Sequence, residues 1–194
     1  MIDTKFMYRR IRYVITNPAR AWKHIRDENR TVKTVILSYL LPLISVVSLA
    51  AFAGTLIYTH SRLSILFPII ISVKLFLSLY LTILLSAWVI NEISVAYRQN
   101  KNYEFSFKLV SYAITPLIVI MVITRLFPLL MFLNILGFYG AFILWVGINT
   151  MEDITSNGAI RFFILALTSI IIFYLSISWI LGSVLEGLYF LIFS

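Results

Sequence analysis

Residues 108–149 read KLVSYAITPLIVIMVITRLFPLLMFLNILGFYGAFILWVGIN, and this stretch decides the fold. It holds two apolar runs, 109–124 and 129–148, separated by a short break around Arg125 and Pro128. Each run has about the length that a helix needs to cross a hydrocarbon core of ~30 Å at ~1.5 Å per residue. Because the break leaves room only for a tight hairpin, the stretch predicts two antiparallel transmembrane helices.

The second run carries its small residues on one side of the predicted helix. Asn134, Gly137, Gly140, Ala141 and Gly147 all fall on that side at about 100° per residue. Helices associate in lipid by close approach, and a smooth side of this kind permits it. We therefore expect Gly140 and Gly147 to face another helix at close range.

The first run carries Tyr112, Thr115 and Pro116 on one face. Proline removes a backbone hydrogen bond from the middle of a helix. In lipid such a loss is compensated by a neighbouring helix or by a side-chain hydroxyl. We expect one of these beside Pro116.

Several short motifs in and before this stretch carry a family resemblance. Ser-Tyr-Ala-Ile-Thr-Pro at 111–116, Tyr-Gly at 139–140 and Trp-Val-Gly at 145–147 resemble the third and fourth spans of the Yip1 family of small multi-span membrane proteins. Asn-Pro-Ala-Arg-Ala-Trp-Lys-His-Ile at 17–25 and Tyr-Leu-Leu-Pro-Leu at 39–43 look like the bacterial branch of that family. The similarity covers about residues 10–180.

The resemblance implies a multi-span helical fold in which the residues that match the family motifs support helix packing. Those positions in this chain are Tyr112, Pro116, Tyr139, Gly140 and Gly147. In eukaryotic relatives the resemblance implies roles in vesicle traffic and binding of small GTPases. Their Asp-Leu-Tyr-Gly-Pro signature is absent from this sequence. We therefore do not expect this chain to bind a small GTPase.

The composition is that of an integral membrane protein. Hydrophobic residues make up 61% of the 194 residues, charged residues only 12%, and the mean hydropathy is +0.96. Soluble domains carry about 25% charged residues. There is no cysteine, which excludes disulfides and thiolate chemistry. No catalytic motif or phosphate-binding glycine loop occurs, so we expect no enzyme, no cofactor and no metal.

Hydropathy predicts an all-α, polytopic helix bundle with five transmembrane helices, preceded by amphipathic interfacial helices. We divide the chain into a basic amphipathic segment, 1–33, and a five-span membrane domain, 34–194. The expected spans are 34–58, 65–96, the two central runs and 159–181, with an apolar tail at 182–194. Glu152 and Asp153, in the loop before the last span, form either a solvated turn or a site for a hard cation, and nothing in their spacing favours the cation.

The first 33 residues hold nine basic side chains interleaved with aromatic and aliphatic ones. Asn17 and Pro18 suit the start of a helix. We interpret the segment as two short helices at the membrane surface, in contact with anionic lipid rather than nucleic acid. The alternative is a solvated basic arm that only sets topology. The expected headgroup contacts are Arg9, Arg10, Arg12, Arg20, Lys23 and Arg26.

Orientation follows from the Lys and Arg residues near the ends of the spans. The N-terminal segment and the loops near 97–108 and 150–161 hold 13 of them, and the other side holds Arg62 and Arg125. By the positive-inside rule, the N-terminus is expected in the cytoplasm and the C-terminus outside, in what we take to be a bacterial inner membrane. A reporter fused to the C-terminus tests this expectation.

Polar residues recur every fourth position in the second span, beginning with a lysine. Lys74, Ser78, Thr82 and Ser86 form this polar lane, and Glu186 is a lone acid near the external end of the fifth span. A charge inside a span is costly, so we expect Lys74 to pair with Glu186. The alternative pairs Glu186 with Arg125, which is itself expected to contact a lipid phosphate. The hydroxyls serve either a polar groove or ordinary helix packing.

Two function hypotheses follow. The first is a non-enzymatic membrane scaffold of the Yip1 type, contacting anionic lipid, protein partners or further copies of itself. The second is a transporter or lipid-moving protein that uses the polar lane around Lys74. A cavity at Lys74 favours the second hypothesis, and a dry bundle favours the first.

Overall fold

The computed structural model describes residues 4–28, 30–58, 65–96, 102–150 and 156–193. Within these ranges every regular element is a helix. Five helical stretches are long and apolar enough to cross a membrane, which confirms the predicted all-α membrane bundle. They are Val32–Tyr58, Leu66–Val95, Tyr103–Leu126, Pro128–Asn149 and Gly158–Tyr189.

Most spans are assembled from shorter helical elements. In chain order the elements are α1 (Thr4–Thr16), α2 (Pro18–Asp27), α3 (Val32–Val35), the π-helical turn η1 (Ile36–Leu40), α4 (Leu41–Tyr58), α5 (Leu66–Ala96), α6 (Tyr103–Ala113), α7 (Thr115–Leu126), the 3-10 stretch η2 (Pro128–Phe138), α8 (Tyr139–Asn149), α9 (Ser156–Leu181), the π-helical turn η3 (Gly182–Glu186) and α10 (Gly187–Phe193).

Two boundaries differ from the sequence prediction. The third span begins at Tyr103, inside the expected loop, because the Asn102 side chain accepts a hydrogen bond of 3.0 Å from the Phe105 N–H and caps the helix. The last helix does not end near Leu181 but continues through η3 and α10 to Phe193. The expected apolar tail is therefore helical.

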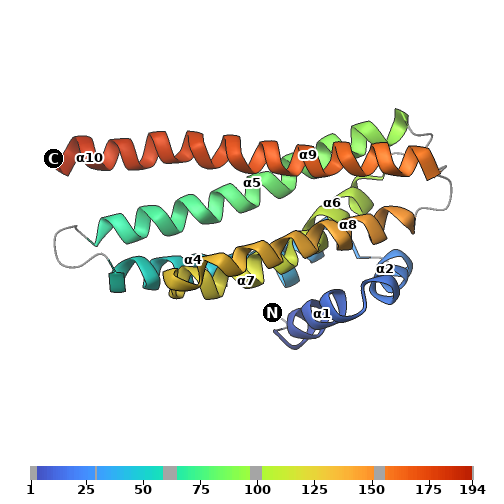
Figure 1. The fold of residues 1–194 in the computed structure, drawn as a ribbon, viewed down its shortest axis with the longest axis horizontal. Helices are drawn as coiled ribbons and strands as arrows, with labels where there is room; N and C mark the ends of the chain where they lie inside the picture. The colour runs from blue at the N-terminus through green and yellow to red at the C-terminus, as the bar shows by residue number, and fades with distance from the viewer. Residues whose placement is uncertain (1–3, 29, 59–64, 97–101, 151–155, 194) are drawn as a thin grey trace.

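The helices form an elongated bundle with two flanks. Figure 1 shows α5 and α9 along one flank and α4, α7 and α8 along the other, with α1 and α2 below one end. α5 packs against α4, α6 and α9, so it joins the two flanks. The C-terminal helix α10 lies at the opposite end from α2, as an odd number of crossings requires.

The break between α7 and η2 is the predicted tight hairpin. The Phe127 N–H donates to the Ile123 carbonyl at 2.9 Å and closes α7. Across the hairpin, the Thr124 hydroxyl donates to Oδ1 of Asn134 at 3.0 Å. In lipid such a bond satisfies two polar groups that have no water nearby.

The smooth side of the fourth span faces other helices, as predicted. A Cβ atom added at Gly140 would collide with the Ala113 carbonyl oxygen at the end of α6. A Cβ at Gly147 would lie 2.5 Å from Cδ1 of Leu109 and 2.7 Å from Cε2 of Trp22. Both positions are occupied by glycine because backbone and ring atoms take the space of a side chain.

Pro116 divides the third span into α6 and α7. Ile114 lies between the two helices, and Pro116 stands in the first turn of α7. The Thr115 hydroxyl donates to the Ser111 carbonyl at 3.1 Å, and it also lies 2.6 Å from the Tyr39 hydroxyl on η1. The broken helix therefore has both a local hydroxyl and a neighbouring helix beside it.

Replacing Gly140 with leucine should sharply reduce the yield of folded protein in detergent. Overpacking a tight contact costs about 1–3 kcal/mol, and here the obstacle is backbone that has little freedom to move. Gly187→Leu is the matched control, because a Cβ there meets no atom within 4 Å. Equal melting temperatures for Gly140→Leu and Gly187→Leu would contradict the packing of α8 on α6.

Candidate functional site: an intramembrane ion pair and a docked basic segment

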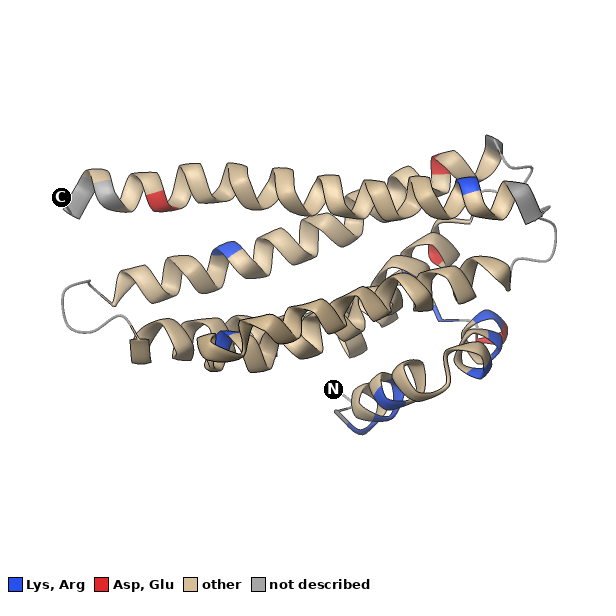
Figure 2. Ribbon diagram, in the orientation of Figure 1, with Lys and Arg blue, Asp and Glu red and all other residues tan. Residues whose placement is uncertain are grey.

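Lys74 and Glu186 form an ion pair inside the membrane-spanning part of the chain. Nζ of Lys74, on α5, donates to Oε1 of Glu186, on η3, at 2.6 Å. Their side chains are 24% and 30% exposed. Figure 2 shows few charges along the long helices, in contrast to α1 and α2. The predicted pairing is confirmed, and the alternative of Glu186 with Arg125 is not the contact observed.

The last helix accommodates this pair by a local change in geometry. η3 is a π-helical turn, and such turns in helices are frequent at functional sites. Gly182 opens the turn, and a Cβ there would lie 2.9 Å from Nζ of Lys74. The glycine therefore leaves the space in which the ammonium group reaches Glu186.

The surroundings make the pair energetically important. An ionised side chain that loses its partner inside a membrane-spanning helix is costly. Beyond the pair, the ring of Phe67 on α5 packs against that of Tyr189 on α10, with centroids 5.3 Å apart. The ionic contact holds η3 against α5, and the aromatic contact holds α10 against it.

A cavity of about 80 Å³ lies beside Lys74. Its lining includes Arg125 from α7 and Tyr174 and Ser178 from α9. At roughly 30 Å³ per water molecule, it has room for two or three. The cavity places a second cation close to the ion pair, although the two cations come from different flanks of the bundle.

The rest of the polar lane lies in the core. The side chains of Ser78, Thr82 and Ser86 are at most 1% exposed. Their hydroxyl oxygens have no hydrogen-bond partner among the described residues. Of the four residues, Lys74 alone lines the cavity. The three hydroxyl side chains lie between packed helices, where their small size lets the helices approach closely.

The N-terminal segment is docked on the bundle through Trp22. The Trp22 side chain is 1% exposed, and its ring N–H donates to the Ile143 carbonyl on α8 at 2.9 Å. Gly147 provides space for its ring, and Tyr112 meets it edge-on with centroids 6.1 Å apart.

A second contact, from Tyr139, reaches the other N-terminal helix. The Tyr139 hydroxyl donates to the Ile15 carbonyl in α1 at 3.0 Å. Three of the motif positions thus contact the N-terminal segment.

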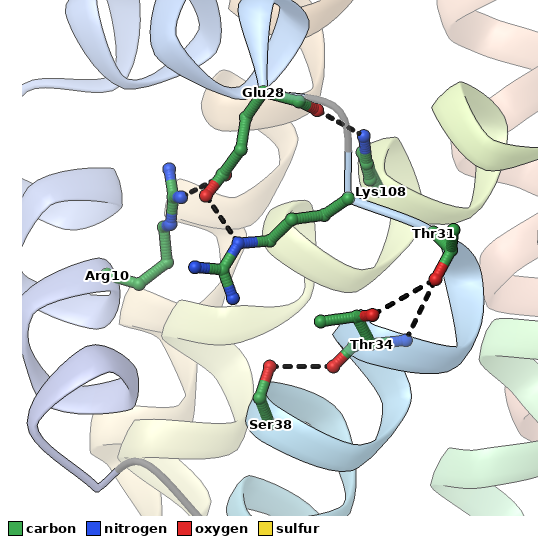
Figure 3. A network of polar contacts seen from close by, with 7 residues as sticks. Arg10, Glu28, Thr31, Thr34, Ser38 and Lys108 are labelled. Carbon is green, nitrogen blue, oxygen red and sulfur yellow. Dashed lines mark hydrogen bonds and ion pairs between the residues drawn. The ribbon is translucent and has the colours of Figure 1, made fainter.

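A charged network around Glu28 secures the end of α2. Figure 3 shows Arg10 and Lys108 directed toward Glu28. Glu28 pairs with Arg10 and, at 2.5 Å, with Arg30, and its backbone carbonyl accepts a bond of 2.9 Å from Nζ of Lys108. These contacts connect α1, the chain before α3, and α6.

The expected headgroup contacts separate into two kinds. Arg10 is 9% exposed and bonded to Glu28, so we remove it from the predicted set. Arg26 is exposed but bonded within the chain: its Nη1 donates to the Thr150 carbonyl at 3.3 Å, and its Nε lies 3.6 Å from the Asp27 carboxylate. The remaining four side chains are exposed: Arg9, Arg12, Arg20 and Lys23.

Sequence reasoning missed the Glu28 network and the Tyr39–Thr115 bond. The pairing of Glu28 could have been predicted, because Glu28 is one of the few acidic residues within a strongly basic segment. Among the described residues, no group of three or more His, Cys, Asp or Glu side chains is placed to hold a metal. Glu152 and Asp153 lie outside the described residues.

The fold and these sites define a polytopic helical membrane protein whose N-terminal helices rest on its third and fourth spans. The family model described as "Yip1 domain" matches residues 12–180. The chain therefore belongs to the Yip1 family, as its motifs indicated. No curated protein and no solved structure gives a significant match.

The Lys74–Glu186 pair should appear as a coupling energy in a double-mutant cycle. We expect Lys74→Met and Glu186→Gln each to lower the melting temperature, and the double variant to lose about 0.5–3 kcal/mol less than the sum of the single losses. A control cycle pairs Glu186→Gln with Arg161→Met, near the start of α9, and should be additive. Additivity in both cycles would show that the pair contributes nothing to stability.

Proposed function

We propose that the protein is a non-enzymatic membrane scaffold that organises anionic lipid, or partner proteins, at the cytoplasmic face. The observation that carries this proposal is the docking of α1 and α2 on the bundle through Trp22 and Glu28. Docking holds the segment in a defined position instead of leaving it as a solvated arm. Its exposed cations then form a fixed surface rather than a diffuse charge.

The exposed members of the predicted headgroup set that make no described contact with the bundle are Arg9, Arg12, Arg20 and Lys23, and we take these four as the basic surface. Each basic residue near an anionic leaflet contributes about 1 kcal/mol, and salt weakens the attraction. The count of basic residues supports an N-terminus on the cytoplasmic side, where anionic lipid of a bacterial inner membrane would meet it. The 1–33 segment thus acts as the contact surface for a membrane domain formed by 34–194.

The second candidate is a transporter or lipid-moving protein. The cavity beside Lys74 and the π-helical turn at Glu186 favour it. The enclosed hydroxyls of Ser78, Thr82 and Ser86 weigh against a continuous polar path, so the scaffold remains the first choice. Neither candidate uses a catalytic group.

The scaffold proposal predicts that anionic lipid is enriched around the full chain when it is extracted from mixed membranes in polymer nanodiscs. Changing Arg9, Arg12, Arg20 and Lys23 together to glutamine should lower that enrichment, as measured by lipid mass spectrometry. The matched control exchanges Arg and Lys at the same four positions and preserves the charge.

Enrichment that stays at the level of the unaltered protein in the glutamine variant would reject the headgroup role of the basic surface. Enrichment lowered equally in both variants would show that the specific side chains, rather than their charge, are required. Enrichment lowered only in the glutamine variant supports the proposal.

A further inference from the structure

Arg125 lies in the last turn of α7, at the hairpin that the positive-inside rule places outside the cell, and its guanidinium group has no described acid partner. Its side chain is exposed at the end of α7, and no described carboxylate forms an ion pair with it. Glu186 is bonded to Lys74, which lines the small cavity together with Arg125. A guanidinium group has five donors in a planar fork that suits a phosphate, and one without an acid partner is available for it.

A larger cavity, of about 520 Å³, opens beside Arg125. This volume is in the range of sites that hold small molecules. It lies between α4, α7, η2 and α9, and its polar lining includes Thr55, Thr124, Arg125, Asn134 and Tyr174. Oδ1 of Asn134 already accepts a bond from Thr124, so the amide NH₂ remains to donate. The polar end of the cavity therefore presents donors.

The charges at this end complement a single negative charge. Arg125 and Tyr174 line both this cavity and the smaller one that holds Lys74. Arg125 and Lys74 carry two formal positive charges and Glu186 carries one negative charge, so the formal net charge is +1. A phosphodiester carries one negative charge, which would balance the site.

An apolar groove of about 220 Å³ continues from the polar cavity. The two share Leu117 and Asn134. Exposed Phe138 and Ile171 lie at its edge, so the groove opens on the surface that faces lipid. Its floor and walls are formed by small and aliphatic residues, among them Ala113, Gly137, Ala141, Leu144 and Leu167.

The length of the groove fits one leaflet. Arg125 and Ala113 are 12 positions apart along α7 and the end of α6, which corresponds to ~18 Å at ~1.5 Å per residue. Half of a hydrocarbon core is ~15 Å thick. An acyl chain that starts at the hairpin would therefore reach the end of the groove near the middle of the membrane.

We propose that this cavity and groove bind one phospholipid of the external leaflet. Its phosphate lies at Arg125, with Lys74 as the second cation, and an acyl chain occupies the groove between α7, α8 and α9. The preferred lipid is anionic, because the net charge at the polar end is positive. This site is at the opposite end of the bundle from the basic surface of α1 and α2, so neither proposal depends on the other.

The test is native mass spectrometry of the full-length protein after delipidation. Dioleoyl phosphatidylglycerol, dioleoylglycerol and inorganic phosphate are added separately, and bound ligand and melting temperature are measured. We expect one tightly retained phosphatidylglycerol, weaker retention of dioleoylglycerol, and no stabilisation by phosphate alone. Comparable retention of dioleoylglycerol would overturn the phosphate contact, and equal stabilisation by inorganic phosphate would overturn the lipid as occupant.

Two variants locate the site. Arg125→Gln should weaken phosphatidylglycerol retention by about tenfold or more, the usual effect of losing a hydrogen bond to a charged group. Arg161→Gln, an exposed arginine at the other end of α9, is the matched control and should retain the lipid. Ala141→Phe fills the groove without changing any charge and should also lose it.

Wild-type retention in both Arg125→Gln and Ala141→Phe would contradict the proposal. If Arg125→Gln does not fold, the comparison of phosphatidylglycerol with dioleoylglycerol on the unaltered protein and the result for Ala141→Phe decide the question. A loss in Arg161→Gln equal to that in Arg125→Gln would show nonspecific binding by charge and would also reject the site.

Discussion

The close contact between α6 and α8 is the constraint on which the rest of the structure depends. Gly140 lies against the Ala113 carbonyl, where no side chain fits. About two turns further along the same face, Gly147 leaves the space that the Trp22 ring occupies. Because Trp22 also bonds to the Ile143 carbonyl, the position of α2 follows directly from the packing of two transmembrane helices. Family motif residues and the N-terminal segment are thus parts of one packed unit.

Charges inside the membrane impose a second constraint, at the other end of the bundle. Lys74 is tolerated because Glu186 meets it, and Glu186 is in place because the last helix continues beyond Leu181 through a π-helical turn. Arg125 has no such acid partner in the described chain, although it lines the same small cavity. The basic residues at the two ends of the bundle therefore differ in their partners. Near α2, Glu28 pairs with Arg10 and Arg30. At the end of α7, Arg125 lines an open cavity.

Much of the bundle could be predicted from the sequence because hydropathy and helix length are properties of single segments. The five spans and the tight hairpin before Pro128 came from this signal. The Lys74–Glu186 pair was predictable because isolated charges in apolar helices need partners, and few were available. The position of Gly140 was predictable because small residues on one helix face indicate close approach.

Other features depend on contacts that no local pattern records. Lys108 is 80 positions from Glu28, and only the folded chain brings its ammonium group to the Glu28 carbonyl. Arg10 has the same appearance in the sequence as Arg9 and Arg12, yet the rotation of α1 turns it inward. The start of the third span depended on a single Asn102 cap, and the helical C-terminal segment on a π-helical turn that hydropathy does not encode.

The measurement that tests the docking of the N-terminal segment most directly is a spin-label distance in lipid nanodiscs. The chain has no cysteine of its own, so spin labels attach only to the two introduced cysteines. These are Lys23→Cys on α2 and Asn149→Cys on α8. Docking through Trp22 predicts one narrow, short distance in the otherwise unaltered protein and a broad distribution when Trp22→Ala is added. A broad distribution with Trp22 present, indistinguishable from that of the Trp22→Ala protein, would contradict it.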